Sequence, residues 1–227
     1  MSGRLHTAAL DLFVERGYFG TSVSDICRRA GMGRSSFYES MRSKEQLFLH
    51  LSAYSFEIWR ATWRPLVDHE GSSIVDRLEQ HLNSAVASAI AQPSAIALCR
   101  LPVARMPNLL AEKMSERMSI HRRDYWRLIA QLFELAKADD EVVRQPTETL
   151  AASWISFLDG ILLQQLSAPT TEKALHVSHV HDCFRLYRRG IARRSAGPSS
   201  TQDLGQPSFS VETHYPQPVA ERSSITC

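Results

Sequence analysis

The side chains best suited to recognition chemistry lie close together between positions 34 and 39 of the chain. They are Arg34, Ser35, Ser36 and Glu39. An arginine can donate two hydrogen bonds to the edge of a guanine, a glutamate can accept one from cytosine, and a serine can contact any base. At the start and exposed side of a helix, these residues would be the candidate base-reading residues of a DNA-binding element.

The charge around these residues favours the same interpretation. From Ser24 to Lys44 there are five basic residues and two acidic residues, although the whole chain has a net charge of only +2. A local basic excess suits a surface that faces phosphates. Thr21 and Ser22 add hydroxyl groups at the expected start of a helix, where a phosphate can bind. The alternative is a small helical hairpin with an ordinary solvated face.

Capping and turn residues predict the helices that would hold these side chains. The segment Ser22 to Asp25 fits a capping box, in which a hydroxyl and a carboxylate bond the free N–H groups of a first turn. Gly31 is expected to end that helix with a positive φ, and Gly33 to start the next one. The segment Ser43 to Gln46 fits a second capping box, which opens a third helix. A helix, a short glycine-containing turn and a second helix form the helix-turn-helix pattern.

Residues 4–51 resemble the DNA-binding domain of the TetR family of transcriptional repressors. The resemblance lies in the segments AALDLFVERGYFGTSVSDICRRAG, at residues 8–31, and FYESMRSKEQL, at residues 37–47. The sequence departs from the family pattern at two positions. Met41 stands where phenylalanine is usual, which keeps an apolar anchor four residues after Phe37, and Gly33 stands where serine is common.

The resemblance also implies contacts, partners and a function. Tyr38 and Lys44 match positions that usually contact DNA phosphates in the family. The expected function is ligand-responsive transcriptional repression by a homodimer, whose two recognition helices lie about one DNA turn (~34–36 Å) apart on a palindromic operator. A small-molecule inducer bound in the second domain would change that spacing and release the double-stranded DNA. No cofactor is implied.

Composition excludes several other classes of protein. The 227 residues are 44% hydrophobic and 22% charged, which is ordinary for a globular protein. No apolar run approaches the roughly 18 residues that a membrane span requires, so no membrane partner is expected. The N-terminus lacks the apolar core of a signal peptide. The four cysteines are scattered along the chain, which favours a reducing cytoplasm.

Hydrophobic periodicity and proline positions predict helices over the rest of the chain. The expected helices cover residues 4–16, 43–63, 74–91, 94–101, 107–138, 146–166 and 171–194, in addition to the two of the helix-turn-helix. The predicted fold class is therefore all-α. A three-helix DNA-binding domain over residues 1–50 precedes a larger helical bundle over 51–194 for ligand binding and dimerisation. Residues 195–227, rich in serine and proline, are expected to be a disordered tail.

Aromatic, sulfur-containing and polar residues of the second domain are candidates for a ligand site. The candidates are Trp59, Trp63, His81, Cys99, Arg105, Met106, Trp126, Phe133, Trp154 and Asp159. The rings would line a pocket between bundle helices, and the polar members would anchor the ligand. An ordinary core is the alternative for each of these residues. The lining favours an apolar or aromatic inducer, although Arg105 could hold an anion if it faces inward.

Residues 148–194 are the expected dimer surface. The segment 148–166 is apolar on most of the circumference of a helix, so it must be buried on several sides. Together with the next helix, 171–194, it would form a four-helix bundle across a two-fold axis. A charge at Ile161, in the middle of the segment, is expected to give monomers.

Two further patterns bear on metal binding and catalysis. His176, His179, His181 and Cys183 crowd the last helix, and the spacing of His179 and Cys183 would allow them to share a zinc ion. Without a paired-cysteine or HExxH motif, a structural role is favoured over a metal site. The chain also lacks a glycine-rich phosphate loop and a Gly-x-Ser-x-Gly motif, so no catalytic residues are assigned and no enzyme is expected.

Two other functional classes stay open from the sequence. One is a helical regulator that binds DNA without a small-molecule ligand and offers its bundle to another protein. The other is an enzyme or a small-molecule carrier with a vestigial helix-turn-helix. Loss of operator binding in Arg34→Ala would favour a regulator, and turnover of a metabolite by the purified protein would favour an enzyme.

Overall fold

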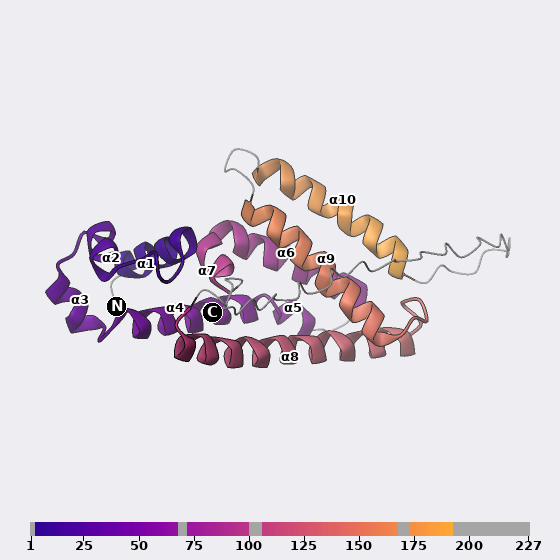
Figure 1. Ribbon diagram of the computed structural model, residues 1–227. Helices are drawn as coiled ribbons and strands as arrows, with labels where there is room; N and C mark the ends of the chain where they lie inside the picture. Colours follow the sequence, from indigo (N-terminus) through magenta and orange to yellow (C-terminus); the bar gives the residue numbers. More distant parts are fainter. Residues whose placement is uncertain (1–2, 68–71, 100–105, 168–172, 193–227) are drawn as a thin grey trace, which may run out of the picture. The chain divides into compact units, whose positions relative to one another are not determined.

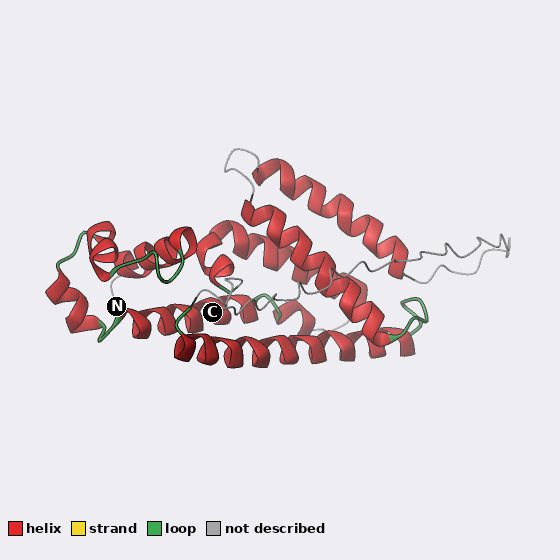
Figure 2. Ribbon diagram, in the orientation of Figure 1, coloured by secondary structure: helices red, strands yellow, loops and turns green. Residues whose placement is uncertain are grey.

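The computed structural model describes residues 3–67, 72–99, 106–167 and 173–192, and within these ranges every regular element is a helix (Figure 1, Figure 2). The helices are α1 (Gly3–Arg16), α2 (Val23–Ala30), α3 (Arg34–Ser40), α4 (Lys44–Ala61), α5 (Arg64–Val67), α6 (Ile74–Ala91), α7 (Pro93–Leu98), α8 (Asn108–Ala138), α9 (Thr147–Ser167) and α10 (Lys173–Ile191). The all-α class is confirmed, with a three-helix domain, α1–α3, before a larger helical bundle. The predicted tail, 195–227, lies outside the described residues.

The capping residues of the first helices act largely as the sequence predicts. Ser22 Oγ accepts a hydrogen bond from the N–H of Asp25 at 3.1 Å, and the Asp25 carboxylate accepts one from the N–H of Ser22 at 3.2 Å. Gly31 ends α2 with a φ of 64°, in the left-handed region that glycine adopts at little cost. The second capping box is only half formed: Ser43 Oγ accepts from the N–H of Gln46, but the Gln46 side chain accepts from the N–H of Arg42.

Within the described residues, the prolines of the second domain lie at the starts of helices. The helix expected over residues 43–63 ends slightly earlier, at Ala61, and Pro65 lies in the first turn of the short helix α5. Pro93 opens α7, which ends at Leu98, short of the predicted Leu101. A proline costs little in a first turn, since its missing N–H would have no helical partner there. Pro107 precedes α8 as its N-cap.

Buried apolar side chains form two cores. The amino-terminal core combines residues of α1–α4, such as Phe13 and Phe37, with residues of α7 and the first half of α8, such as Leu98 and Met114. The carboxy-terminal core combines α5, α6, the second half of α8, α9 and α10. Helix α8 therefore packs in both cores, and α7 packs on α1 and α4 rather than on the bundle alone.

A polar contact supports the packing of α7 on α1. Ser94 Oγ donates to the Asp11 carboxylate at 2.5 Å, beside apolar contacts made by Ala95 and Leu98. None of the described helices combines the length and the apolarity needed to cross a membrane.

Candidate DNA interface and ligand cavity

The sequence of α3 divides it into a buried side and an exposed side. Phe37 is fully buried and Met41, which caps the helix, is 8% exposed, so these two side chains fix α3 on the amino-terminal core. The remaining side chains of the helix point to solvent. The five predicted DNA contacts on this helix, Arg34, Ser35, Ser36, Tyr38 and Glu39, are all exposed. The helix thus presents donors and acceptors on one surface without burying any of them.

The last two arginines of α2 form ion pairs, whereas the arginine of α3 forms none with a described residue. Arg28 pairs with Asp25, and Arg29 makes two hydrogen bonds to the carboxylate of Glu15, at 2.8 and 3.0 Å. The Ser22 hydroxyl and the Arg28 guanidinium lower the pKa of Asp25 to about 2, so this helix cap stays charged. Arg34, in contrast, makes no ion pair with any residue that the structure describes. Its guanidinium is therefore available to an outside partner.

The two hydroxyl groups before α2 are engaged within the chain. Thr21 is 1% exposed, and its hydroxyl shares its proton between the carbonyl oxygens of Leu12 and Gly17. This contact closes the end of α1, so a phosphate contact at Thr21 could not involve the side chain in this conformation. Ser22 is exposed, but its hydroxyl donates to the Asp25 carboxylate at 2.5 Å.

Lys44, a further predicted DNA contact, is held by backbone oxygens. Its Nζ donates to the carbonyls of Tyr18 and Thr21, each at 2.9 Å, and lies 4.1 Å from the centre of the Tyr18 ring. Burial lowers the pKa of Lys44. The ammonium group therefore fastens the start of α4 to the turn before α2. One of its three N–H groups is left for another acceptor, and the predicted phosphate contact stays a prediction.

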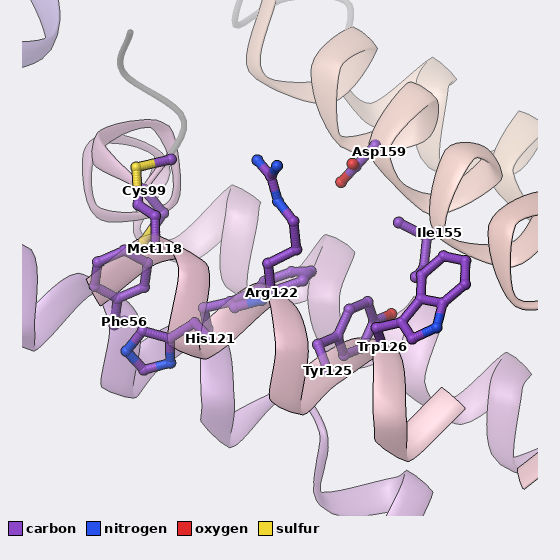
Figure 3. A pocket seen from close by; sticks show the side chains of 10 residues that line it. Phe56, Cys99, Met118, His121, Arg122, Tyr125, Trp126, Ile155 and Asp159 are labelled. Carbon is purple, nitrogen blue, oxygen red and sulfur yellow. The ribbon is translucent and has the colours of Figure 1, made fainter. Parts of the chain in front are cut away.

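A cavity of about 440 Å³ lies among α4, α8 and α9, next to the end of α7 (Figure 3). It is lined by Phe56, Trp59, Cys99, Met118, His121, Arg122, Tyr125, Trp126, Ile155 and Asp159. The volume falls in the range of about 300–1,000 Å³ that is usual for small-molecule sites. Four of the residues predicted from sequence line it: Trp59, Cys99, Trp126 and Asp159.

The other predicted ligand residues that the structure describes do not line this cavity. Trp154 and Phe133 are fully buried in the carboxy-terminal core, Trp63 stacks on Tyr125 in the same core, and Met106 packs in the amino-terminal core. Arg105 lies outside the described residues. For these four packed residues, the structure supports the alternative of an ordinary core.

The sequence prediction missed six lining residues, four of which lie on α8. They are Phe56, Met118, His121, Arg122, Tyr125 and Ile155. With Trp126, the α8 residues recur at three- and four-residue spacing, which places them on one side of the helix. That spacing was present in the sequence, but it could be found only by following one face of α8 rather than by residue type.

His81 is a buried hydrogen-bonding residue behind the cavity wall. Its Nδ1 lies 2.8 Å from the carbonyl oxygen of Thr62, its Nε2 lies 2.9 Å from the Tyr125 hydroxyl, and Trp154 Nε1 donates to that hydroxyl at 3.1 Å. Burial lowers the pKa of His81 to about 4, so the ring is neutral near pH 7. A carbonyl only accepts, so Nδ1 carries the proton and Nε2 accepts from Tyr125.

This arrangement links the cavity wall to three other helices. Tyr125 belongs to α8, His81 to α6 and Trp154 to α9, and Thr62 is the residue that caps α4. A displacement of the Tyr125 ring would therefore break its hydrogen bonds to His81 and Trp154, and His81 is in turn bonded to Thr62 at the end of α4. His81 was predicted as a ligand anchor, and the structure places it one layer behind the residues that line the cavity.

The described parts of α9 and α10 each expose a large apolar side chain. Leu163 of α9 is 63% exposed and Leu186 of α10 is 68% exposed. Ile161, which the sequence suggested as a dimer contact, is only 8% exposed and belongs to the chain's own carboxy-terminal core. Dimerisation is therefore better tested by placing a charge at Leu163, because a charge at Ile161 would disturb the folding of the single chain.

The histidines of α10 whose side chains the structure describes, His179 and His181, do not belong to a metal-binding group. No group of three or more potential metal-binding side chains occurs among the described residues. His179 is exposed, and His181 approaches Glu79 of α6 at 4.0 Å, beside the pairs that Arg188 makes with Asp76 and Glu79. The side chain of His176 lies outside the described part of the structure. The charged residues of α10 thus attach it to α6.

Comparison with known proteins identifies the N-terminal region. Residues 5–51 match the model of a family described as bacterial regulatory proteins, tetR family. No curated protein matches the chain.

Solved structures share the fold over most of the chain. A TetR family transcriptional regulator from Chloroflexus aurantiacus has a TM-score of 0.64 at 19% identity, covering 84% of this chain and 93% of that one. The fatty acid degradation regulator FadR from Bacillus halodurans has a TM-score of 0.61 at 16% identity, covering 82% and 94%. AibR, solved with isovaleryl coenzyme A and operator DNA, has a TM-score of 0.59 at 17% identity, covering 80% and 98%.

Proposed function

Because this chain is a transcriptional regulator of the tetR family, we propose that it represses transcription as a dimer bound to a palindromic operator and leaves the DNA when a small molecule occupies the cavity. The observation that carries this proposal is that α4 extends from the DNA-binding domain to the wall of the cavity. The helix starts at Lys44, which is bonded to the DNA-binding domain, and it contributes Phe56 and Trp59 to the cavity wall. One helix thus connects both binding sites.

On the DNA side, α3 is the proposed recognition helix. Its exposed N-terminal residues Arg34, Ser35 and Ser36 would contact base edges, and Glu39 would follow on the same exposed surface. Tyr38, with half of its surface exposed, and the remaining N–H of Lys44 would contact phosphates. A domain of this size reads only a few base pairs, so two copies on one operator would supply the rest of the specificity.

The dimer would form through α9 and α10. In the described parts of these helices, Leu163 and Leu186 leave apolar surface in water, which a second copy would cover. A two-fold axis through this face would double each contact, since both copies present the same surface. The resulting pair would hold two α3 helices at a fixed separation.

Ligand binding would change that separation through the helices that the two sites share. Besides α4, α7 links them: Ser94 and Leu98 contact the DNA-binding domain, and Cys99, just after α7, lines the cavity. Arg117 and Lys113 of α8 also contact Leu49 and Glu45 of α4. AibR, which shares the fold, has been solved with both isovaleryl coenzyme A and operator DNA. This supports the proposal that a regulator with this fold binds a small molecule as well as DNA.

The experiment that tests this function is selection of bound DNA from a random pool, using the full chain. We expect a palindrome whose half-sites lie about one helical turn apart. A compound library is then screened for tryptophan fluorescence changes, because Trp59 and Trp126 line the cavity. A compound that binds should also lower operator affinity. Selection without any enriched sequence would contradict the DNA-binding part, and a bound compound without effect on the operator would contradict the induction part.

A further inference from the structure

The cavity has two chemically different sides. Its floor is made of rings, among them Phe56, Trp59 and Tyr125, which offer apolar faces. On another side, the Arg122 guanidinium from α8 and the Asp159 carboxylate from α9 extend toward one another, away from the Phe56 and Tyr125 rings (Figure 3). A ligand that fills this space would therefore have an apolar body and a polar group at one end.

Arg122 is the group on this side that lacks a partner. It forms no ion pair or hydrogen bond with any described residue, whereas Arg60 on α4 pairs with Glu57, and Arg117, earlier on α8, donates to the Leu49 carbonyl. Asp159 already takes part in an interaction of its own. An incoming anion would thus find an unused guanidinium, while an incoming cation would have to compete for Asp159 and tolerate Arg122 beside it.

A second polar atom of the lining also lacks a partner. The imidazole of His121 is stacked on the Phe56 ring, with 4.2 Å between centroids, and its Nδ1 is buried without a hydrogen bond among the described residues. Because that nitrogen has no accessible surface, a ligand in the cavity would meet other atoms of the ring, and Arg122 is the unmatched nitrogen group that the ligand can reach.

We propose that the cavity takes an organic acid, with an aromatic or other apolar body on the ring floor and a single carboxylate on Arg122. This inference rests on the proposed function, because it names the chemical class of the regulating ligand. A carboxylate can accept two parallel hydrogen bonds from a guanidinium. A monoanion suits the site better than a phosphate dianion, since Asp159 also lines the cavity and its repulsion grows with the negative charge of the ligand.

The test uses three compounds that share a phenyl ring on a three-carbon chain and differ in the polar end group. They are 3-phenylpropanoate, 3-phenylpropan-1-ol and 3-phenylpropylammonium. Each is titrated into the full-length protein while tryptophan fluorescence is followed. A charge-assisted hydrogen bond at a partly solvated site should let the acid bind at least about tenfold more tightly than the alcohol. The ammonium should bind more weakly than the acid. Arg122→Gln should abolish the preference for the acid, and Arg122→Lys should keep part of it.

Arg123→Gln is the matched control, because Arg123 is exposed on the same helix and does not line the cavity. It should keep the full preference for the acid. Equal binding of acid and alcohol, tighter binding of the ammonium, or an unchanged preference in Arg122→Gln would overturn the assignment of the head group. Failure of all three probes to bind up to about 10 mM would overturn the cavity as a site for such ligands.

The same titrations separate this inference from the proposed function. Binding of the probes is repeated with the selected operator DNA present. If the acid binds through Arg122 but leaves operator affinity unchanged, the head-group inference holds and the induction mechanism fails. If the alcohol binds as well as the acid and both release the DNA, the induction mechanism holds and the inference fails.

Discussion

The ammonium group of Lys44 is assigned two roles, one in the stability of the domain and one in DNA binding. The carbonyl oxygens of Tyr18 and Thr21 hold it within the domain, and the family resemblance assigns it to a DNA phosphate. Lys44→Met keeps the apolar stem and removes the charge. We expect a loss of stability of about 1–3 kcal/mol, measured by urea unfolding, because the two charged hydrogen bonds are lost. The plot of log K against log salt should also become flatter by about one unit of slope. An unchanged slope would leave Lys44 a structural role only.

Arg34 should decide which sequence is bound. Since its guanidinium is exposed and unpaired among the described residues, Arg34→Ala should cost about 1–3 kcal/mol on the selected operator and relax the preference at one base position. Stability should not change, because the side chain is exposed and makes no ion pair with a described residue. Arg123→Ala on α8 serves as control and should bind the operator as wild type does. Equal operator affinity of Arg34→Ala and wild type at matched salt would contradict the base-reading role.

His81 should make the protein sensitive to acid. Its pKa is lowered from 6.5 to about 4, so between these values the unfolded chain binds a proton that the folded chain does not. The stability contributed by the neutral ring is therefore complete above about pH 6.5 and is lost as the pH falls toward 4. The loss amounts to about 3 kcal/mol.

The measurement is the free energy of unfolding in urea at several pH values. The pKa values of His6 and His121 are also lowered by burial, so they add to the acid sensitivity in the same direction. His81→Gln should be less stable at pH 7 but should vary less with pH than wild type. His179→Gln, at an exposed position, should keep the wild-type profile. If His81→Gln shows the same pH dependence as wild type, another group is responsible.

At the scale of elements, the sequence predicts what short-range chemistry controls. The Ser22 cap, the positive φ at Gly31 and the bounds of α6 follow from residues that interact within one or two turns. The second capping box differs in detail because the Gln46 side chain found another N–H within reach, that of Arg42. Such local alternatives differ too little in free energy for the sequence to separate them.

The cavity could be predicted only in part, because it depends on which helices face one another. Residue type marked Trp59 and Trp126, which line the cavity, but it also marked Trp154, which is fully buried in the core. His81 satisfies its hydrogen bonds with Thr62 and Tyr125, which are distant in sequence. Nothing in the immediate neighbourhood of His81 identifies those partners. The role of α8 as a member of both cores is likewise a property of the packed chain.

At the scale of the whole molecule, the proposed dimer can be tested at one exposed leucine. Leu163→Glu places a charge where a second copy would bury an apolar side chain worth about 1.5–3 kcal/mol, and the two-fold axis doubles the effect. We expect monomers by sedimentation equilibrium and loss of operator binding, with little change in unfolding of the single chain. Leu135→Glu, at a leucine that is 54% exposed on α8, should stay dimeric. A dimeric Leu163→Glu variant would rule out this face.

Ligand and DNA should oppose one another across this dimer, because α4, α7 and α8 all take part in the packing around both sites. Binding free energies are reciprocal, so a ligand that weakens operator binding must itself bind more weakly to the operator complex. Such couplings are typically about 1–3 kcal/mol. Trp59→Ala, which removes a cavity wall at the end of α4, should blunt the effect of the ligand while leaving ligand-free operator binding nearly intact.

The most direct measurement is therefore a pair of titrations with one cavity-binding compound, monitored by tryptophan fluorescence. One titration uses the free protein and the other uses the protein saturated with its selected operator. The proposed mechanism predicts an affinity about 5- to 150-fold lower in the operator complex. The same factor should appear in the loss of operator affinity at saturating ligand. Equal affinity of the compound for the free protein and for the operator complex would contradict it.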